Sequence, residues 1–138
     1  MQQLPLDENQ AQLLDAIAGE MILRWLRDGT VISANSILCE YLGTTEKDLR
    51  ENLYFAYVFD QDHARLMEYI STFSQQDSRK SIDYRLITKN SDVQWMNWRD
   101  YYHYNSDLQR YEFLSIGHNI SESSISFSMV NYIEKFDR

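Results

Sequence analysis

The chain has 138 residues, of which 43% are hydrophobic and 14% aromatic, and its formal net charge is −8. That length fits one domain, and the apolar content is ample for a packed core, which excludes a disordered chain. An acidic protein repels phosphate backbones, and no run of Lys or Arg supplies a basic patch. We therefore expect no nucleic-acid binding.

Cysteine usage and targeting signals bear on where the protein works. Cys39 is the only cysteine, so no internal disulfide can form and a reducing compartment is favoured. The N-terminal segment contains no secretory signal, and no apolar run approaches the ~18 residues that cross a bilayer. We therefore expect a cytoplasmic domain without direct membrane insertion, although a longer parent protein could be membrane-bound.

The first predicted element is an amphipathic helix over residues 7–18. Asp7 can cap this helix and Gly19 can end it. Its apolar stripe consists of Gln10, Leu13, Leu14 and Ile17. We assign residues 1–19 to this flanking helix.

A hairpin and a group of helices follow. Apolar-rich strands are predicted at 21–26 and 30–34, joined by a two-residue turn at Asp28-Gly29. Either Asn35 or Ser36 can cap the next helix. Helical spacing predicts two short helices and one longer helix, which cover residues 37–42, 44–49 and about 60–73.

Three strands are predicted in the second half, at about 81–88, 93–104 and 110–118. Asn90, which tolerates a left-handed backbone, marks the first turn between them. The middle strand carries large rings on both faces. Trp95 and Tyr101 lie on one face, and Met96, Trp98, Tyr102 and Tyr104 lie on the other. We therefore expect the first helix or a second copy of the chain to cover the outer face.

This order of elements predicts an α+β fold, with a five-stranded antiparallel sheet and helices on one face. We assign residues 20–121 to this domain. A last helix is predicted within 122–138, with a stripe of Ile125, Met129, Tyr132, Ile133 and Phe136. This helix either carries a signal outward or packs back on its own sheet, and the sequence leaves both alternatives open.

Short motifs occur along the chain in a characteristic order and spacing. They are Asp28-Gly29-Thr30-Val31 followed by Asn35, Tyr41-Leu42-Gly43, Asp60-Gln61-Asp62, Tyr84-Arg85-Leu86, Trp95 and Asn119-Ile120-Ser121. Together they resemble the PAS domain, a small sensor fold of bacterial signalling proteins, over about residues 14–122. The resemblance implies a PAS-like five-stranded antiparallel sheet, flanked by N- and C-terminal helices.

The resemblance also implies a signal exit at the end of the last strand. The family's closing Asp-Ile-Thr is here Asn119-Ile120-Ser121, followed by Glu122. Asn and Ser keep hydrogen-bonding capacity, but a charge-assisted bond is lost because Asn is neutral. We expect Asn119, Ile120, Ser121 and Glu122 to connect the sheet to the outgoing helix.

A ligand pocket is the second site that the resemblance implies. The face of Met96 and Trp98 would point inward, towards the long helix. The candidate pocket residues are Leu66, Ile70, Tyr84, Leu86, Met96, Trp98, Phe113 and Ser115. The alternative is that these side chains simply fill the core. The resemblance does not identify a cofactor.

Coloured cofactors and metals find little support in the sequence. Cys39 lacks the neighbours of a flavin-reactive cysteine and is predicted to be a small buried residue. His63 is the one haem-ligand candidate, but the first turn of a helix normally faces solvent. His103 and His118 have no spaced ligand partners, so no metal site is expected.

Catalysis is not expected either. Asp60 and Asp62 are interpreted as capping carboxylates at a helix start. The chain has no triad order with supporting motifs and no phosphate loop, so we predict that it is not an enzyme.

The resemblance therefore implies a sensory module of a bacterial signal-transduction protein. It would bind a small ligand or partner and relay its state to an output domain, either a kinase of a two-component system or a cyclic-dinucleotide enzyme such as a diguanylate cyclase. A homodimer through the 7–18 helix and the outer sheet face is expected. The alternative is a ligand-free interaction or dimerisation module.

Overall fold

The computed structural model describes residues 19–121, so the predicted helices at 7–18 and within 122–138 lie outside the described residues. The strands are β1 (Met21–Trp25), β2 (Val31–Ala34), β3 (Arg79–Ile87), β4 (Val93–Asn105) and β5 (Arg110–Asn119). The helices are α2 (Ser36–Leu42), α3 (Glu46–Glu51) and α4 (His63–Ser71), with 3₁₀ turns η1 (Tyr54–Tyr57) and η2 (Asp60–Asp62).

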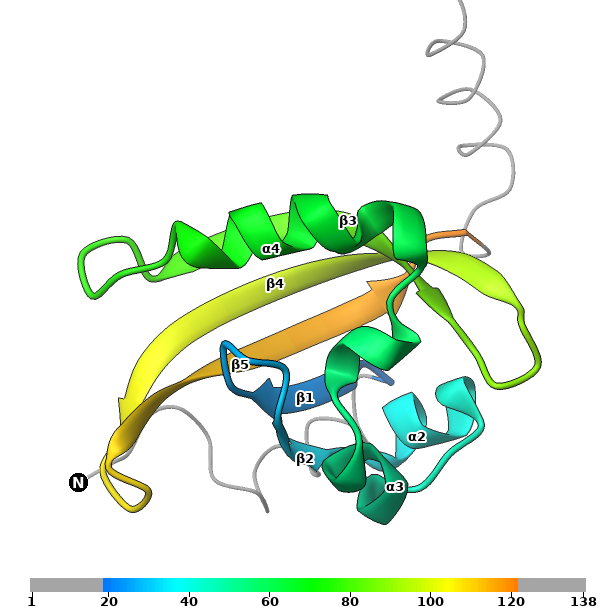
Figure 1. Cartoon of the computed structure of the whole chain (residues 1–138), viewed down its shortest axis with the longest axis horizontal. Coiled ribbons are helices and arrows are strands. Elements are labelled where there is room, and N and C mark those ends of the chain that lie inside the picture. Colours follow the sequence, from blue (N-terminus) through cyan, green and yellow to red (C-terminus); the bar gives the residue numbers. More distant parts are fainter. Residues whose placement is uncertain (1–18, 122–138) are drawn as a thin grey trace, which may run out of the picture.

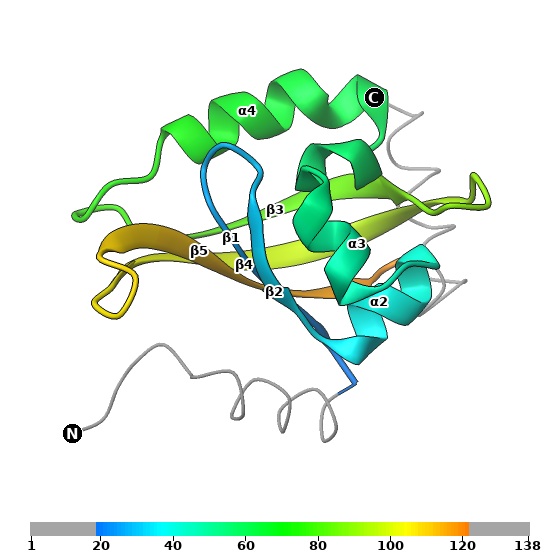
Figure 2. The same cartoon turned by 60° about the horizontal axis from the view of Figure 1, so that its bottom comes forward.

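The strands form one antiparallel sheet in the order β2-β1-β5-β4-β3 (Figure 1). The two ends of the described chain meet where β1 pairs with β5, with Leu23 opposite Ser115. The helices all lie on one face of the sheet (Figure 2). The predicted five-stranded antiparallel sheet with helices on one face is confirmed.

Side-chain caps fix where the short helices begin. Asn35 Oδ1 accepts a hydrogen bond from Leu38 N at 3.1 Å, so α2 begins at Ser36 and Asn35 is its cap. Thr45 Oγ1 accepts from Asp48 N at 3.1 Å, which places the start of α3 after Thr45. The predicted start at residue 44 was therefore early.

Two turns differ from their prediction. The first hairpin has a three-residue loop, because Leu26 N donates to Thr30 O at 2.8 Å and Gly29 takes φ +96°. Between β3 and β4 the positive φ of 68° falls on Ser91 and not on Asn90. Closure of that turn by the bond from Thr88 N to Asp92 O, 2.9 Å, places Ser91 at the left-handed position.

The core lies between the helices and the inner face of the sheet. Met96 and Trp98 point inward and have no exposed surface, as the resemblance implied. Trp98 packs directly on the backbone of Gly117, because a Cβ at that glycine would lie 2.5 Å from the indole ring. Cys39 is a buried free thiol within the same core, as predicted.

The outer face of the sheet carries a smaller apolar cluster. Ile22 and Leu114 are buried there, and Tyr101 and Ile116 pack against them. Trp95 also lies on this face and keeps 36% of its surface exposed. That the first helix or a second copy of the chain covers this face stays a prediction.

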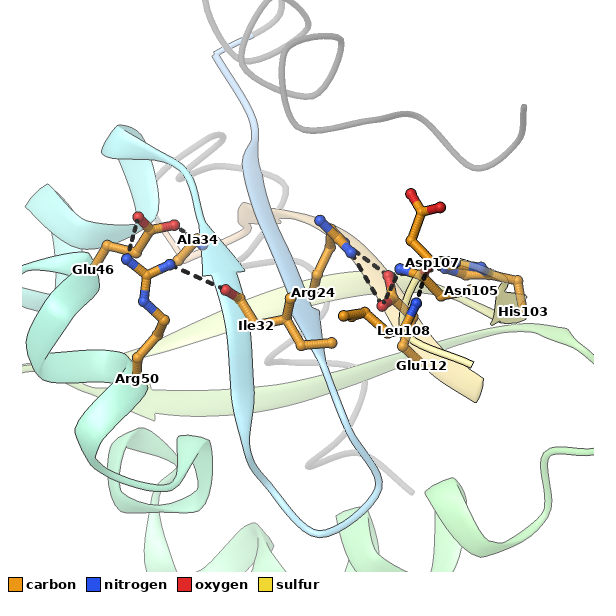
Figure 3. Close-up of polar contacts among 10 residues, drawn as sticks. All are labelled: Arg24, Ile32, Ala34, Glu46, Arg50, His103, Asn105, Asp107, Leu108 and Glu112. Carbon is orange, nitrogen blue, oxygen red and sulfur yellow. Dashed lines mark hydrogen bonds and ion pairs between the residues drawn. The ribbon is translucent and has the colours of Figure 1, made fainter. Parts of the chain in front are cut away.

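The edge strand β2 is protected by side chains of α3 (Figure 3). Glu46 Oε2 accepts a hydrogen bond from Ala34 N at 3.0 Å, and Arg50 Nη1 donates to Ile32 O at 3.4 Å. Glu46 and Arg50 also form an ion pair at 3.3 Å. Charged groups thus occupy backbone positions that another strand would otherwise use.

Candidate functional site

The structure brings the eight predicted pocket residues together in one buried layer under α4. Each has at most 2% of its surface exposed. They come from four elements: Leu66 and Ile70 from α4, Tyr84 and Leu86 from β3, Met96 and Trp98 from β4, and Phe113 and Ser115 from β5. Their placement in the core is therefore established, and a role in ligand contact stays a prediction.

A buried carboxyl group that the sequence analysis did not select lies at the centre of this layer. Asp100, on the inner face of β4, is 3% exposed. Tyr69 OH donates to its Oδ2 at 2.5 Å, and Ser115 Oγ donates to its Oδ1. Trp25 Nε1 in turn donates to Ser115 Oγ at 2.9 Å. One polar network thus joins β1, α4, β4 and β5.

Burial controls the ionisation of this network. It raises the pKa of Asp100 to about 6, against the opposing effect of the Ser115 and Tyr69 hydroxyls. Burial and the neighbouring Asp100 carboxylate raise the pKa of Tyr69 well above its usual range. Lys80, directly opposite Asp100 in the β3–β4 register, uses its Nζ on Thr72 Oγ1, 2.6 Å away. Among the described residues, the polar partners of Asp100 are therefore hydroxyl groups.

Two further polar features lie in the same layer. The hydroxyls of Tyr54 and Tyr84 are hydrogen-bonded at 2.5 Å. Burial raises the pKa of both phenols, so both are neutral donors and acceptors near neutral pH. The Nε1 of Trp98 is buried and has no hydrogen-bond partner among the described residues. Since buried N–H groups are nearly always paired, this indole is an exception that calls for an explanation.

A second buried carboxylate lies on the outer face of the sheet (Figure 3). The side chain of Glu112 has no exposed surface and accepts from Arg24 Nε at 2.7 Å and from Asn105 Nδ2 at 3.0 Å. His103 Nε2 lies 3.2 Å from the same carboxylate. Burial raises the pKa of Glu112, but the nearby His103 and the hydrogen bonds from Arg24 and Asn105 outweigh it and bring the pKa to about 2.

The predicted exit is tied to the start of β4. Trp95 N donates to Ser121 Oγ at 2.7 Å, and Ile120 N donates to Trp95 O at 2.9 Å. Within the exit, Ser121 N donates to Asn119 Oδ1 at 2.8 Å. Asn and Ser thus make the local bonds that the resemblance implied. Glu122 lies outside the described residues.

The interpretation of Asp62 as a helix-capping carboxylate is wrong. Its side chain makes no cap hydrogen bond and is 3% exposed. It accepts instead from Arg85 Nη2 at 2.7 Å, from Arg85 Nε at 3.0 Å and from Arg85 N at 2.8 Å. The guanidinium fork matches a carboxylate better than a single amide does, which explains the preference.

The histidines occupy separate positions. His63 begins α4, and its Nε2 lies 2.7 Å from Val58 O. His118 Nδ1 lies 3.7 Å from Glu20. Within residues 19–121 there is no cluster of three or more His, Cys, Asp or Glu that could hold a metal ion. No helix in this part of the chain is long and apolar enough to cross a membrane.

Comparisons with known proteins agree with this architecture. The PAS domain of an HTR-like protein from Haloarcula marismortui is 19% identical, with a TM-score of 0.68 over 81% of this chain and 90% of that one. A sensory box histidine kinase/response regulator from Burkholderia thailandensis is 14% identical, with a TM-score of 0.67 over 91% and 95%. The PAS-B domain of Drosophila melanogaster Cycle, with bound ethylene glycol, is 15% identical, with a TM-score of 0.63 over 72% and 99%.

A search of curated proteins gave no match. A family model described as the PAS fold matches residues 31–116. Because this match spans more than half of the chain, the chain belongs to the PAS fold family.

Proposed function

We propose that this domain is a sensory module that binds a small molecule in the layer under α4 and relays its state to an output domain. The observation that carries this proposal is the polar composition of that layer. Ligand sites are mostly apolar, with a few convergent polar groups. Here Trp98 Nε1 is a buried donor without a partner in the described part of the chain, and Asp100 lies two residues along the same strand face.

The chemistry of the layer favours a small, neutral, polar ligand. An acceptor atom on the ligand would satisfy the Trp98 indole, and a hydroxyl could join the Tyr54–Tyr84 pair or the Asp100 network. The Cycle PAS-B structure holds ethylene glycol, a molecule of this class. The eight pocket residues would then surround the ligand, mainly through apolar contact.

The proposed output rests on the exit and on the likeness to signalling proteins. The exit bond from Trp95 N to Ser121 Oγ holds Ser121 beside the start of β4. The Burkholderia protein is a histidine kinase/response regulator, so a kinase of a two-component system is the favoured output. A cyclic-dinucleotide enzyme is the other candidate. The module itself would be non-catalytic and, with its single thiol, cytoplasmic.

Relay would proceed by a shift between two packings of sheet and helix, amplified in a homodimer. The outer apolar cluster of Ile22, Leu114, Tyr101 and Ile116 supports contact with a second copy. Sedimentation analysis tests this part, since a strict monomer at high concentration would rule out the dimer.

Native mass spectrometry of freshly purified protein tests the ligand. We expect a bound small molecule that is lost in Trp98→Phe, which keeps an aromatic ring but removes the N–H donor. An absorbance spectrum of the same sample would expose a haem or flavin. If no molecule copurifies and none of a panel of small polyols binds, the alternative of a ligand-free interaction module is favoured.

A further inference from the structure

Arg85 contacts both the segment before α4 and Trp95, the residue that bonds the sheet exit. On one side its guanidinium binds Asp62, the residue directly before α4, through two bonds at 2.7 and 3.0 Å. Its backbone N–H also donates to Asp62, and its carbonyl accepts from Phe59 N at 2.9 Å. The start of α4 is therefore attached to β3 at this one residue.

On its other side Arg85 lies against the aromatic residue that holds the exit. Arg85 and Trp95 are directly opposite each other in the β3–β4 register. The guanidinium carbon lies 4.6 Å from the centroid of the Trp95 ring and 4.7 Å from that of Phe59. The cation is thus held between two rings, a geometry that is favourable and sensitive to ring position.

Trp95 completes the connection through its backbone. Its N–H donates to Ser121 Oγ, and its carbonyl accepts from Ile120 N. A displacement of Trp95 therefore moves both bonds that hold the exit.

We propose that Arg85 couples the position of the α4 start to the order of the exit, through Asp62 on one side and Trp95 on the other. This inference rests on the proposed relay function and names the residues that perform it. A change in the layer under α4 that moves Asp62 would pull the guanidinium from the Trp95 ring and loosen the exit bonds. Spatial continuity alone does not demonstrate coupling, so a direct measurement is required.

Amide hydrogen exchange on the full chain measures this coupling. Asp62→Asn removes the charge that holds the guanidinium but keeps the shape of the side chain. We expect the Trp95 and Ile120 amides to exchange about tenfold faster in this variant. The Arg85 amide bonds Asp62 directly, so it is not an informative reporter.

Glu112→Gln is the matched control, because it removes a buried carboxylate that pairs with an arginine at the other end of β5. If Trp95 and Ile120 exchange no faster in Asp62→Asn than in this control, the proposal is overturned. Should Asp62→Asn fail to fold, Arg85→Lys keeps the ion pair but loses the planar fork. It should accelerate the same two amides by a smaller factor, and unchanged rates would again overturn the coupling.

This measurement needs neither a ligand nor an output domain. A protein that copurifies with no small molecule would contradict the proposed ligand and leave the exchange result intact. Faster exchange at Arg85 alone would show that the Asp62–Arg85 pair is a local structural contact and would reject the coupling.

Discussion

Replacing Asp100 by Asn removes a carboxylate that is buried among hydroxyls. The substitution keeps the shape of the side chain. The Tyr69 and Ser115 hydroxyls that donate to Asp100 can also accept, so an asparagine amide can still be satisfied there. The variant therefore isolates the effect of the charge from the effect of the hydrogen bonds.

The size of that effect follows from the pKa of Asp100, which rises from 3.8 to about 6 on folding. The raised pKa means that the folded state binds the proton more tightly than the unfolded chain. Its contribution to stability is therefore complete below the unfolded pKa and is lost as pH rises through the folded pKa. A difference of about two pKa units corresponds to about 3 kcal/mol in total.

The assay is urea unfolding of the wild type and Asp100→Asn at several pH values. Between about pH 4.5 and about pH 7.5 the wild type should lose about 2 kcal/mol relative to the variant. The contributions of other titrating groups cancel in this difference, because both chains contain them. Asp92→Asn, at an exposed turn position, serves as the control for an Asp-to-Asn substitution outside the core.

If the unfolding free energies of the wild type and Asp100→Asn change with pH in the same way, the reasoning is refuted. They would mean that Asp100 does not titrate in this range. The carboxyl would then have a compensating positive charge that keeps its pKa low, or it would stay protonated throughout. If the wild type loses more than about 3 kcal/mol of unfolding free energy relative to the variant, the network breaks when the carboxylate ionises.

Three further substitutions test Glu112, the core packing and the Asp100 network. Glu112→Gln should lower the free energy of unfolding by about 3 kcal/mol at neutral pH. The wild type should lose this contribution as the pH falls from 4.5 towards 2, whereas the variant lacks it throughout. Urea titrations in which both proteins lose the same stability over this pH range would contradict this. Gly117→Ala places a Cβ 2.5 Å from the Trp98 ring, so thermal unfolding should show a loss of about 1–3 kcal/mol. Ser115→Ala removes a donor that lowers the pKa of Asp100, so an NMR titration of the variant should place the midpoint of Asp100 above 6. An unchanged midpoint would count against the network.

The sheet and its inner face could be predicted because they depend on local patterns. Strand alternation placed Met96 and Trp98 on one face, and the resemblance to the PAS domain implied that this face points inward. Both residues are fully buried. The Asn35 cap of α2 was also predicted, because a cap acts over three residues of the same helix. Turn details were less predictable. The left-handed residue is chosen by closure of the whole turn, which favoured Ser91 over Asn90.

The polar contacts could not be predicted because their partners are distant in sequence. Asp100 falls at an inward position of the same alternation that selected Trp98, and that was the available signal. Its partner Tyr69 comes from α4, 31 residues earlier. Asp62 looked like a cap because it stands at a helix start, whereas Arg85, 23 residues away, takes its carboxylate. A single sequence does not show such pairings.

Two energetically costly polar groups lie close together under α4, and this links the stability predictions to the proposed function. Asp100 is a buried carboxylate whose charge destabilises the fold above its pKa, and Trp98 Nε1 is a buried donor without a partner among the described residues. They lie on one face of β4, under the helix whose start contacts Arg85. Proteins commonly accept such local costs where a site must bind or move. If Asp100→Asn gains stability at neutral pH and also loses a copurifying ligand, then the carboxylate that destabilises the fold also takes part in ligand binding. If it gains stability and keeps the ligand, Asp100 is a feature of the core alone, and the ligand proposal then rests on Trp98.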